Sequence, residues 1–122
     1  MARILIVEDD RDLNAAYQII LNRAGHTVAS ALNGEQALRT AKDFQPDLIL
    51  LDLLMPVMGG LAFLQAYDLD EHTDVKVVIF TNMENSPEVT QAYNLGVTRC
   101  IIKSWTAPQN LMRVVDDVLQ SH

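Results

Sequence analysis

Short apolar or β-branched runs alternate with segments of helical periodicity along this 122-residue chain. The runs cover residues 3–7, 27–31, 47–51, 76–80 and 98–102. Three of them are almost continuously apolar, which is typical of strands covered on both faces. Strict alternation of strands and helices with short connections predicts an α/β fold, a doubly wound five-stranded parallel sheet with helices on both faces.

Most of the helical segments have a recognisable start or stop signal, such as a capping residue before the helix or a glycine after it. We expect helices from Leu13 to Gly25, from Gly34 through Ala41, from Gly60 to Tyr67, from the N-cap Ser86 to Gly96, and from the cap Thr106 to Leu119.

Composition narrows the classes of function. The length fits a single domain over residues 1–122, and no apolar run approaches the ~20 residues that span a bilayer. The start "MARILIVEDD" lacks a signal-peptide pattern, so we expect a cytoplasmic protein without membrane insertion. One cysteine, Cys100, excludes an internal disulfide, and a net charge of −7 argues against direct nucleic-acid binding.

Charged and hydroxyl side chains follow the predicted strands at one edge of the sheet. They are Glu8, Asp9 and Asp10 after the first strand, Asp52 after the third, Thr81 after the fourth and Lys103 after the fifth. Ligands of open parallel sheets bind beyond the carboxyl ends of the strands. Asp52 is the lone acid in the apolar run "LILLDLLMP", and burying a carboxylate is costly unless it is paired or bound to a metal.

This residue set predicts a chemistry. Carboxylates gathered at one edge repel one another unless a cation joins them. Mg²⁺ suits a site with few protein oxygen ligands and several waters, and we expect Mn²⁺ to substitute for it. Acids, a divalent metal, a lysine and a hydroxyl together can receive a phosphoryl group on a carboxylate nucleophile.

Four motifs carry a family resemblance: "LIVEDD", "DLLMPVMGG", "VVIFTN" and "CIIKS", in this order. With them, the chain resembles from end to end the receiver domain of two-component response regulators, the CheY-like proteins. The resemblance implies a flavodoxin-like (βα)5 fold with strand order 2-1-3-4-5. It also implies a phosphorelay switch that catalyses only its own phosphorylation and dephosphorylation and is not an enzyme acting on a separate substrate.

The resemblance implies roles for individual residues. Asp52 would accept the phosphoryl group and bind Mg²⁺. Asp9 would bind the metal directly, Glu8 chiefly through water, and Leu54 through its backbone carbonyl.

Two further residues, Lys103 and Thr81, would each bind a phosphoryl oxygen. The implied donor is a phosphohistidine on a sensor histidine kinase or phosphotransfer protein. Output to an unknown protein target would run through the face made by helix 4, strand 5 and helix 5. The resemblance also allows a phosphorylation-dependent dimer.

Several positions depart from the family pattern. Cys100 stands where the family typically has Tyr or Phe, and we expect switching to bypass that ring, with Trp105 or Tyr93 as the alternative. Asn82 would either hydrogen-bond the phosphoryl group or hinder it.

Further departures concern the peptide bond after the lysine and the positions that tune phosphoryl loss. Ser104 replaces the usual proline, which leaves the state of the Lys103–Ser104 bond open. The apolar Leu54 and Met83 predict slow self-dephosphorylation.

Two other function classes stay open. A Mg²⁺-dependent aspartyl-phosphate phosphatase commonly has a second acid two residues after its nucleophile, but Leu54 occupies that position here. A pseudo-receiver, which binds partners without being phosphorylated, is kept open by Asn82, Cys100 and Ser104. The acids, Thr81 and Lys103 favour the phosphorylated switch.

Overall fold

A computed structural model describes residues 2–82, 86–102 and 108–120. Its five strands form one parallel sheet in the order β2-β1-β3-β4-β5, which confirms the predicted fold and strand order. The strands are β1 (Arg3–Val7), β2 (Thr27–Ala31), β3 (Leu48–Leu51), β4 (Lys76–Thr81) and β5 (Arg99–Ile102).

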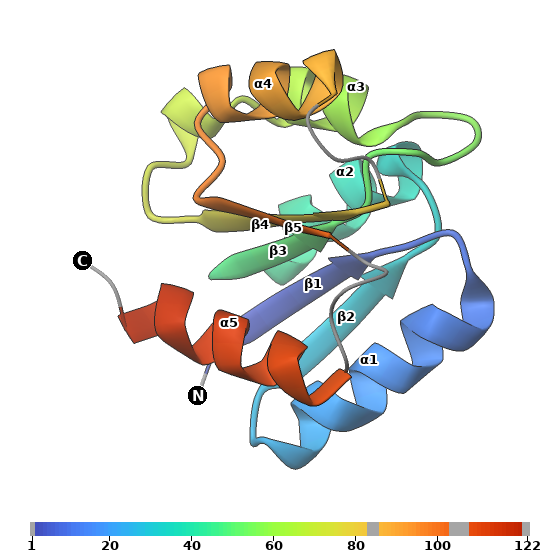
Figure 1. The fold of residues 1–122 in the computed structure, drawn as a ribbon, viewed down its shortest axis with the longest axis vertical. Helices are drawn as coiled ribbons and strands as arrows, with labels where there is room; N and C mark the ends of the chain where they lie inside the picture. Colours follow the sequence, from blue (N-terminus) through green and yellow to red (C-terminus); the bar gives the residue numbers. More distant parts are fainter. Residues whose placement is uncertain (1, 83–85, 103–107, 121–122) are drawn as a thin grey trace.

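Five α-helices connect and follow the strands (Figure 1). They are α1 (Arg11–Arg23), α2 (Gly34–Phe44), α3 (Gly60–Tyr67), α4 (Pro87–Asn94) and α5 (Pro108–Gln120), with a short 3₁₀ turn η1 (Leu69–Glu71) before β4. The first helix begins two residues earlier than the sequence predicts, because the side chain of Asp10 accepts the backbone N–H groups of Asp12 and Leu13. The expected cap Thr106 lies outside the described residues.

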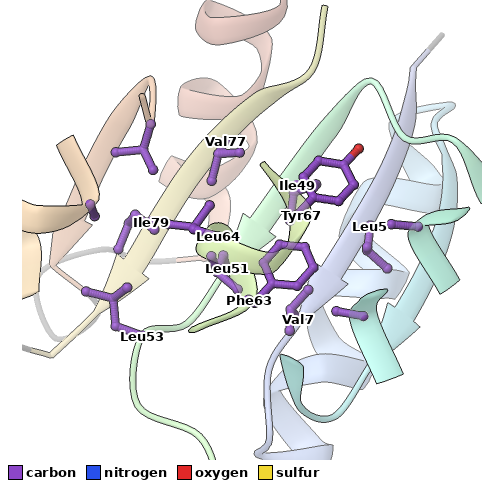
Figure 2. Close-up of a cluster of buried hydrophobic side chains, with 14 of the residues drawn as sticks. Leu5, Val7, Ile49, Leu51, Leu53, Phe63, Leu64, Tyr67, Val77 and Ile79 are labelled. Carbon is purple, nitrogen blue, oxygen red and sulfur yellow. The ribbon is translucent and has the colours of Figure 1, made fainter. Parts of the chain in front are cut away.

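The helices cover both faces of the sheet, α1 and α5 on one and α2, α3 and α4 on the other (Figure 1). Alternate residues of each strand serve the two layers. Ile4 and Ile6 pack with the buried residues of α1 and α5, whereas Leu5 and Val7 pack towards α2 and α3 around Phe63 (Figure 2). Both faces of the central strands are therefore buried, as their continuous apolar sequences predict. None of the described helices is long and apolar enough to cross a membrane.

Candidate functional site

From β1 the chain adds β2 on one side, and it then adds β3, β4 and β5 on the other side of β1. The switch point of the sheet therefore lies between β1 and β3, and the acids follow these two strands. Val7 pairs with Leu51 in the register of the two strands. The backbone N–H of Asp52 then donates to the carbonyl of Val7 at 3.0 Å, and that of Glu8 donates to the carbonyl of Ala31 at 3.1 Å. Glu8 and Asp52 are therefore fixed at the same height, at the edge where ligands of such sheets bind.

Three carboxylates meet at this point. Oxygen atoms of Glu8, Asp9 and Asp52 lie within 4.8 Å of one another. The side chains of Glu8 and Asp52 are buried, with 2 % and 6 % of the residue exposed, while Asp9 is open to solvent. A donor set made only of oxygen suits Mg²⁺, which keeps several waters and needs few protein ligands. These three residues could therefore hold a divalent cation such as Mg²⁺, and their roles as its ligands stay a prediction.

A hydroxyl lies at the same edge. Thr81 is the last residue of β4, the strand next to β3, and is fully buried. Asn82 follows it and is exposed. Of the other predicted site residues, Lys103, Ser104 and Met83 lie outside the described residues.

The loop after β3 presents Asp52 through a set of backbone contacts. The N–H of Leu54 donates to Oδ1 of Asp52 at 3.3 Å. Farther along, the carbonyl of Met58 accepts the N–H of Gly34, the first residue of α2, at 2.8 Å. The loop is thus held by hydrogen bonds at two points, at the side chain of Asp52 and at the first residue of α2.

The end of this loop comes close to the residues that follow β3, which explains why the first residue of α3 is a glycine, Gly60. A Cβ atom on Gly60 would lie 2.7 Å from the carbonyl oxygen of Asp52 and 2.8 Å from Cα of Leu53. The N–H of Gly60 also donates to the carbonyl of Leu53 at 3.0 Å. Because backbone atoms cannot yield as a flexible side chain can, only glycine fits here without moving the end of β3.

The acids influence a neighbouring side chain. Burial raises the pKa of the Tyr17 hydroxyl, and the negative charges of Glu8, Asp10 and Asp52 raise it further. Each carboxylate disfavours a second negative charge nearby. The electrostatic potential is therefore negative from the acid cluster as far as Tyr17 in helix α1. A bound cation would offset this negative charge.

Sequence reasoning missed Asn14, which is 2 % exposed and donates to the backbone carbonyls of Glu8 and Ala31. The available signal was its spacing: Asn14, Tyr17 and Leu21 are the buried residues of α1 and follow the helical repeat of a core-facing stripe. Because buried polar groups are nearly always hydrogen-bonded, a polar residue on such a stripe predicts hydrogen-bond partners in the core.

The fold is thus a doubly wound parallel α/β domain with three carboxylates at its switch point and a hydroxyl at the end of the next strand, β4, at the edge where ligands of such sheets bind. Residues 4–116 match the model of a protein family described as "Response regulator receiver domain". The chain therefore belongs to the receiver-domain family of two-component response regulators.

Individual relatives agree with this assignment. The chain is 33% identical over 115 residues to the DNA-binding dual master transcriptional regulator RpaA of Synechocystis sp., covering 93% of this chain and 48% of that protein. It is 35% identical over 104 residues to Protein CcdB of Bacillus subtilis, covering 84% of this chain and 86% of that one. The chemotaxis response regulator CheY4 of Vibrio cholerae has a similar structure, with a TM-score of 0.86, 29% identity and coverage of 97% and 98%.

The chain spans about half the length of RpaA and of the other transcriptional regulators that it matches, such as PrrA of Mycobacterium tuberculosis at 48%. What it shares with them is the receiver domain. DNA binding is a named property of RpaA.

Proposed function

We propose that this receiver domain accepts a phosphoryl group from a phosphohistidine onto Asp52, with Mg²⁺ as cofactor, and so changes its affinity for a partner protein. The observation that carries the proposal is the cluster of Glu8, Asp9 and the buried Asp52 within 4.8 Å at the switch point of the sheet. A carboxylate that is buried beside two others is poorly solvated, which suits a nucleophile.

In the proposed reaction, a carboxylate oxygen of Asp52 attacks the phosphorus of the donor. The new P–O bond forms as the P–N bond of the phosphohistidine breaks, and the leaving imidazole keeps the bonding electrons and takes up a proton. The N–H of Leu54, which donates to Oδ1 of Asp52, helps to orient the nucleophile. The Thr81 hydroxyl and Lys103 would then bind phosphoryl oxygens.

The predicted metal ligands are Asp9 and Asp52 directly, Glu8 chiefly through water, and the backbone carbonyl of Leu54. A bound Mg²⁺ would supply positive charge that offsets both the carboxylates and the phosphoryl oxygens. Glu8 and Asp9 would hold the ion, and the exposure of Asp9 leaves a path for water and for the donor.

The surface around the acceptor suits a protein donor. Leu54 and Val57 are large apolar residues that are 59 % and 78 % exposed on the loop after Asp52. Apolar side chains beside a polar reaction centre offer contact area to a docking protein. We therefore propose a sensor histidine kinase or a phosphotransfer protein as the donor, and a protein target for the output.

The proposal is tested by the intact mass of the protein after incubation with acetyl phosphate, with and without Mg²⁺. We expect a single phosphoryl adduct that requires the metal and is absent from Asp52→Asn. Asp74→Asn is the matched control, because Asp74 is an exposed acid that precedes β4 at the opposite end of the sheet.

Each outcome separates the function classes. An adduct in the wild type and in Asp74→Asn, but not in Asp52→Asn, supports the switch. Folded protein that forms no adduct with acetyl phosphate or with a phosphorylated histidine kinase would instead support a pseudo-receiver. Steady release of phosphate from small phosphate monoesters would indicate a phosphatase.

A further inference from the structure

A single buried amide joins the two strand ends beneath the acid cluster. Asn14, in the first turns of α1, donates from Nδ2 to the carbonyl of Glu8 at 2.9 Å and to the carbonyl of Ala31 at 3.1 Å. Ala31 is the last residue of β2 and Glu8 directly follows β1, so the side chain of Asn14 bridges the ends of neighbouring strands at the edge that carries the site.

The orientation of this amide is fixed by its neighbour one turn later. Nε2 of Gln18 donates to Oδ1 of Asn14 at 2.8 Å. With its oxygen accepting from Gln18, the amide of Asn14 must turn its NH₂ group towards the two carbonyls. An aspartate or a leucine has no donor to give at this position.

These contacts hold Glu8 at several atoms. Its N–H donates to the carbonyl of Ala31, its carbonyl accepts from Asn14, and its carboxylate accepts the N–H of Asp10 at 3.2 Å. Asp9 lies between Glu8 and Asp10, the N-cap of α1. The connection that carries two of the three clustered acids is therefore anchored on both sides of Asp9.

We propose that Asn14 is a positioning residue for the cation site: it holds the β1–α1 connection so that the carboxylates of Glu8 and Asp9 stay within reach of Asp52. The inference rests on the proposed function, because it assigns a residue to that same metal site. Groups that orient metal ligands commonly raise metal affinity, since the ligands lose less freedom on binding. A residue that served only the fold would change stability and leave metal affinity alone.

The test compares Asn14→Leu, which keeps a similar volume without a donor, with Val118→Ala. Val118 is a buried residue of α5, and its truncation lowers the free energy of unfolding because the removed methyl groups leave a cavity. Calorimetric titration of folded protein with Mg²⁺ should give affinity about tenfold weaker in Asn14→Leu and unchanged in Val118→Ala. Equal Mg²⁺ affinity in Asn14→Leu and wild type would overturn the inference.

A second measurement does not depend on the metal. In metal-free protein, the amides of residues 8–10 should exchange faster in Asn14→Leu than in the wild type. The increase should exceed the one expected from the lower global stability of the variant. If Asn14→Leu does not fold, Gln18→Ala, which leaves Asn14 in place but frees its amide, should give the same local effect. Unchanged exchange at residues 8–10 relative to the core strand β3 would overturn the inference.

The two measurements separate this inference from the proposed function. Wild-type protein that fails to bind Mg²⁺ contradicts the magnesium site, and it also removes the ligand that Asn14 would serve. Wild-type protein that binds Mg²⁺ while Asn14→Leu binds it equally well leaves the proposed function intact and contradicts only the positioning role.

Discussion

The phenolic oxygen of Tyr93 accepts a hydrogen bond of 3.0 Å from the backbone N–H of Cys100. This contact ties α4 to β5, which is an edge strand of the sheet. Cys100 occupies the position where the family typically has an aromatic side chain. In this chain the hydroxyl of an aromatic residue, Tyr93, contacts the backbone at that position from α4, and a part for Tyr93 in switching stays a prediction.

Removing the Tyr93 hydroxyl should loosen this tie. We expect Tyr93→Phe to lower the free energy of unfolding by about 1 kcal/mol, because one hydrogen bond to the backbone is lost. The amide of Cys100 should exchange faster with solvent, as measured by NMR. Thr90→Ala, at an exposed site of the same helix, is the control. Unchanged protection of the Cys100 amide in Tyr93→Phe would show that the contact is not maintained in solution.

Alkaline pH should destabilise the protein through buried acidic groups. Burial raises the pKa of the Tyr67 hydroxyl and of the Cys100 thiol above their ordinary values. Such groups ionise first in the unfolded chain, so their contribution is fully present below the ordinary values, about 8.5 for Cys and 10 for Tyr, and is lost as pH rises through the raised ones.

Urea unfolding between neutral pH and the alkaline range measures this effect. The free energy of unfolding should fall as pH passes the ordinary thiol and phenol pKa values, and Tyr67→Phe should remove part of the fall. The Cys100 thiol should react more slowly with a disulfide reagent than a free cysteine does, because less of it is thiolate. An identical slope in wild type and Tyr67→Phe would contradict the role of Tyr67.

Val57 adopts a backbone conformation that valine disfavours. Its φ angle is +68°, in the left-handed region, and its side chain is 78 % exposed. A β-branched residue there costs about 1–2 kcal/mol, and little burial would be lost with the side chain. We expect Val57→Gly to raise the free energy of unfolding by about 0.5–1 kcal/mol, after the entropy cost of glycine. Val57→Ala keeps the Cβ atom and is the control, which should gain much less in urea unfolding.

The sequence predicts the fold of this chain well because each signal is local and repeated. Apolar runs recur in every βα unit, and side-chain caps mark the starts of α1, α2 and α4. The topology rule then places all strand ends together. The sequence therefore suffices to assign Glu8, Asp9, Asp52 and Thr81 to one edge of the sheet.

Other features depend on contacts that the sequence does not encode locally. From the sequence Asn14 looks like an ordinary polar helix residue, because its hydrogen-bond partners are backbone carbonyls of two distant segments, at Glu8 after β1 and at Ala31 in β2. Val57 has a positive φ against its own preference, and it precedes Met58, whose carbonyl accepts the N–H of Gly34. Side chains that serve distant backbone atoms are thus the part that pattern reasoning misses.

Gly60 should tolerate no side chain. We expect Gly60→Ala to displace the end of β3, because its Cβ atom would lie 2.7 Å from the carbonyl oxygen of Asp52. Phosphorylation by acetyl phosphate should slow strongly, and the free energy of unfolding should fall. Gly59→Ala is the milder comparison, since its Cβ would lie 3.2 Å from the carbonyl oxygen of Leu53. Wild-type phosphorylation rates in Gly60→Ala would show that the loop can move away from the strand.

The phosphorylated protein should lose its phosphoryl group slowly. Leu54, two residues after Asp52, is 59 % exposed and apolar, and Met83, two residues after Thr81, is also apolar. Neither side chain can donate a hydrogen bond, and at most the weakly accepting thioether of Met83 could contact an attacking water. We expect Leu54→Asn and Met83→Glu each to accelerate decay of the phosphoryl adduct several-fold, as followed by intact mass after removal of the donor.

A polar side chain elsewhere on the same loop provides the matched control for this prediction. Val57→Asn adds an amide to the loop after Asp52 but three residues beyond Leu54, so it should leave the decay rate unchanged. Equal acceleration by Val57→Asn would mean that general hydration of the loop sets the rate. Unchanged decay in both Leu54→Asn and Met83→Glu would mean that these two positions do not control the access of water to Asp52.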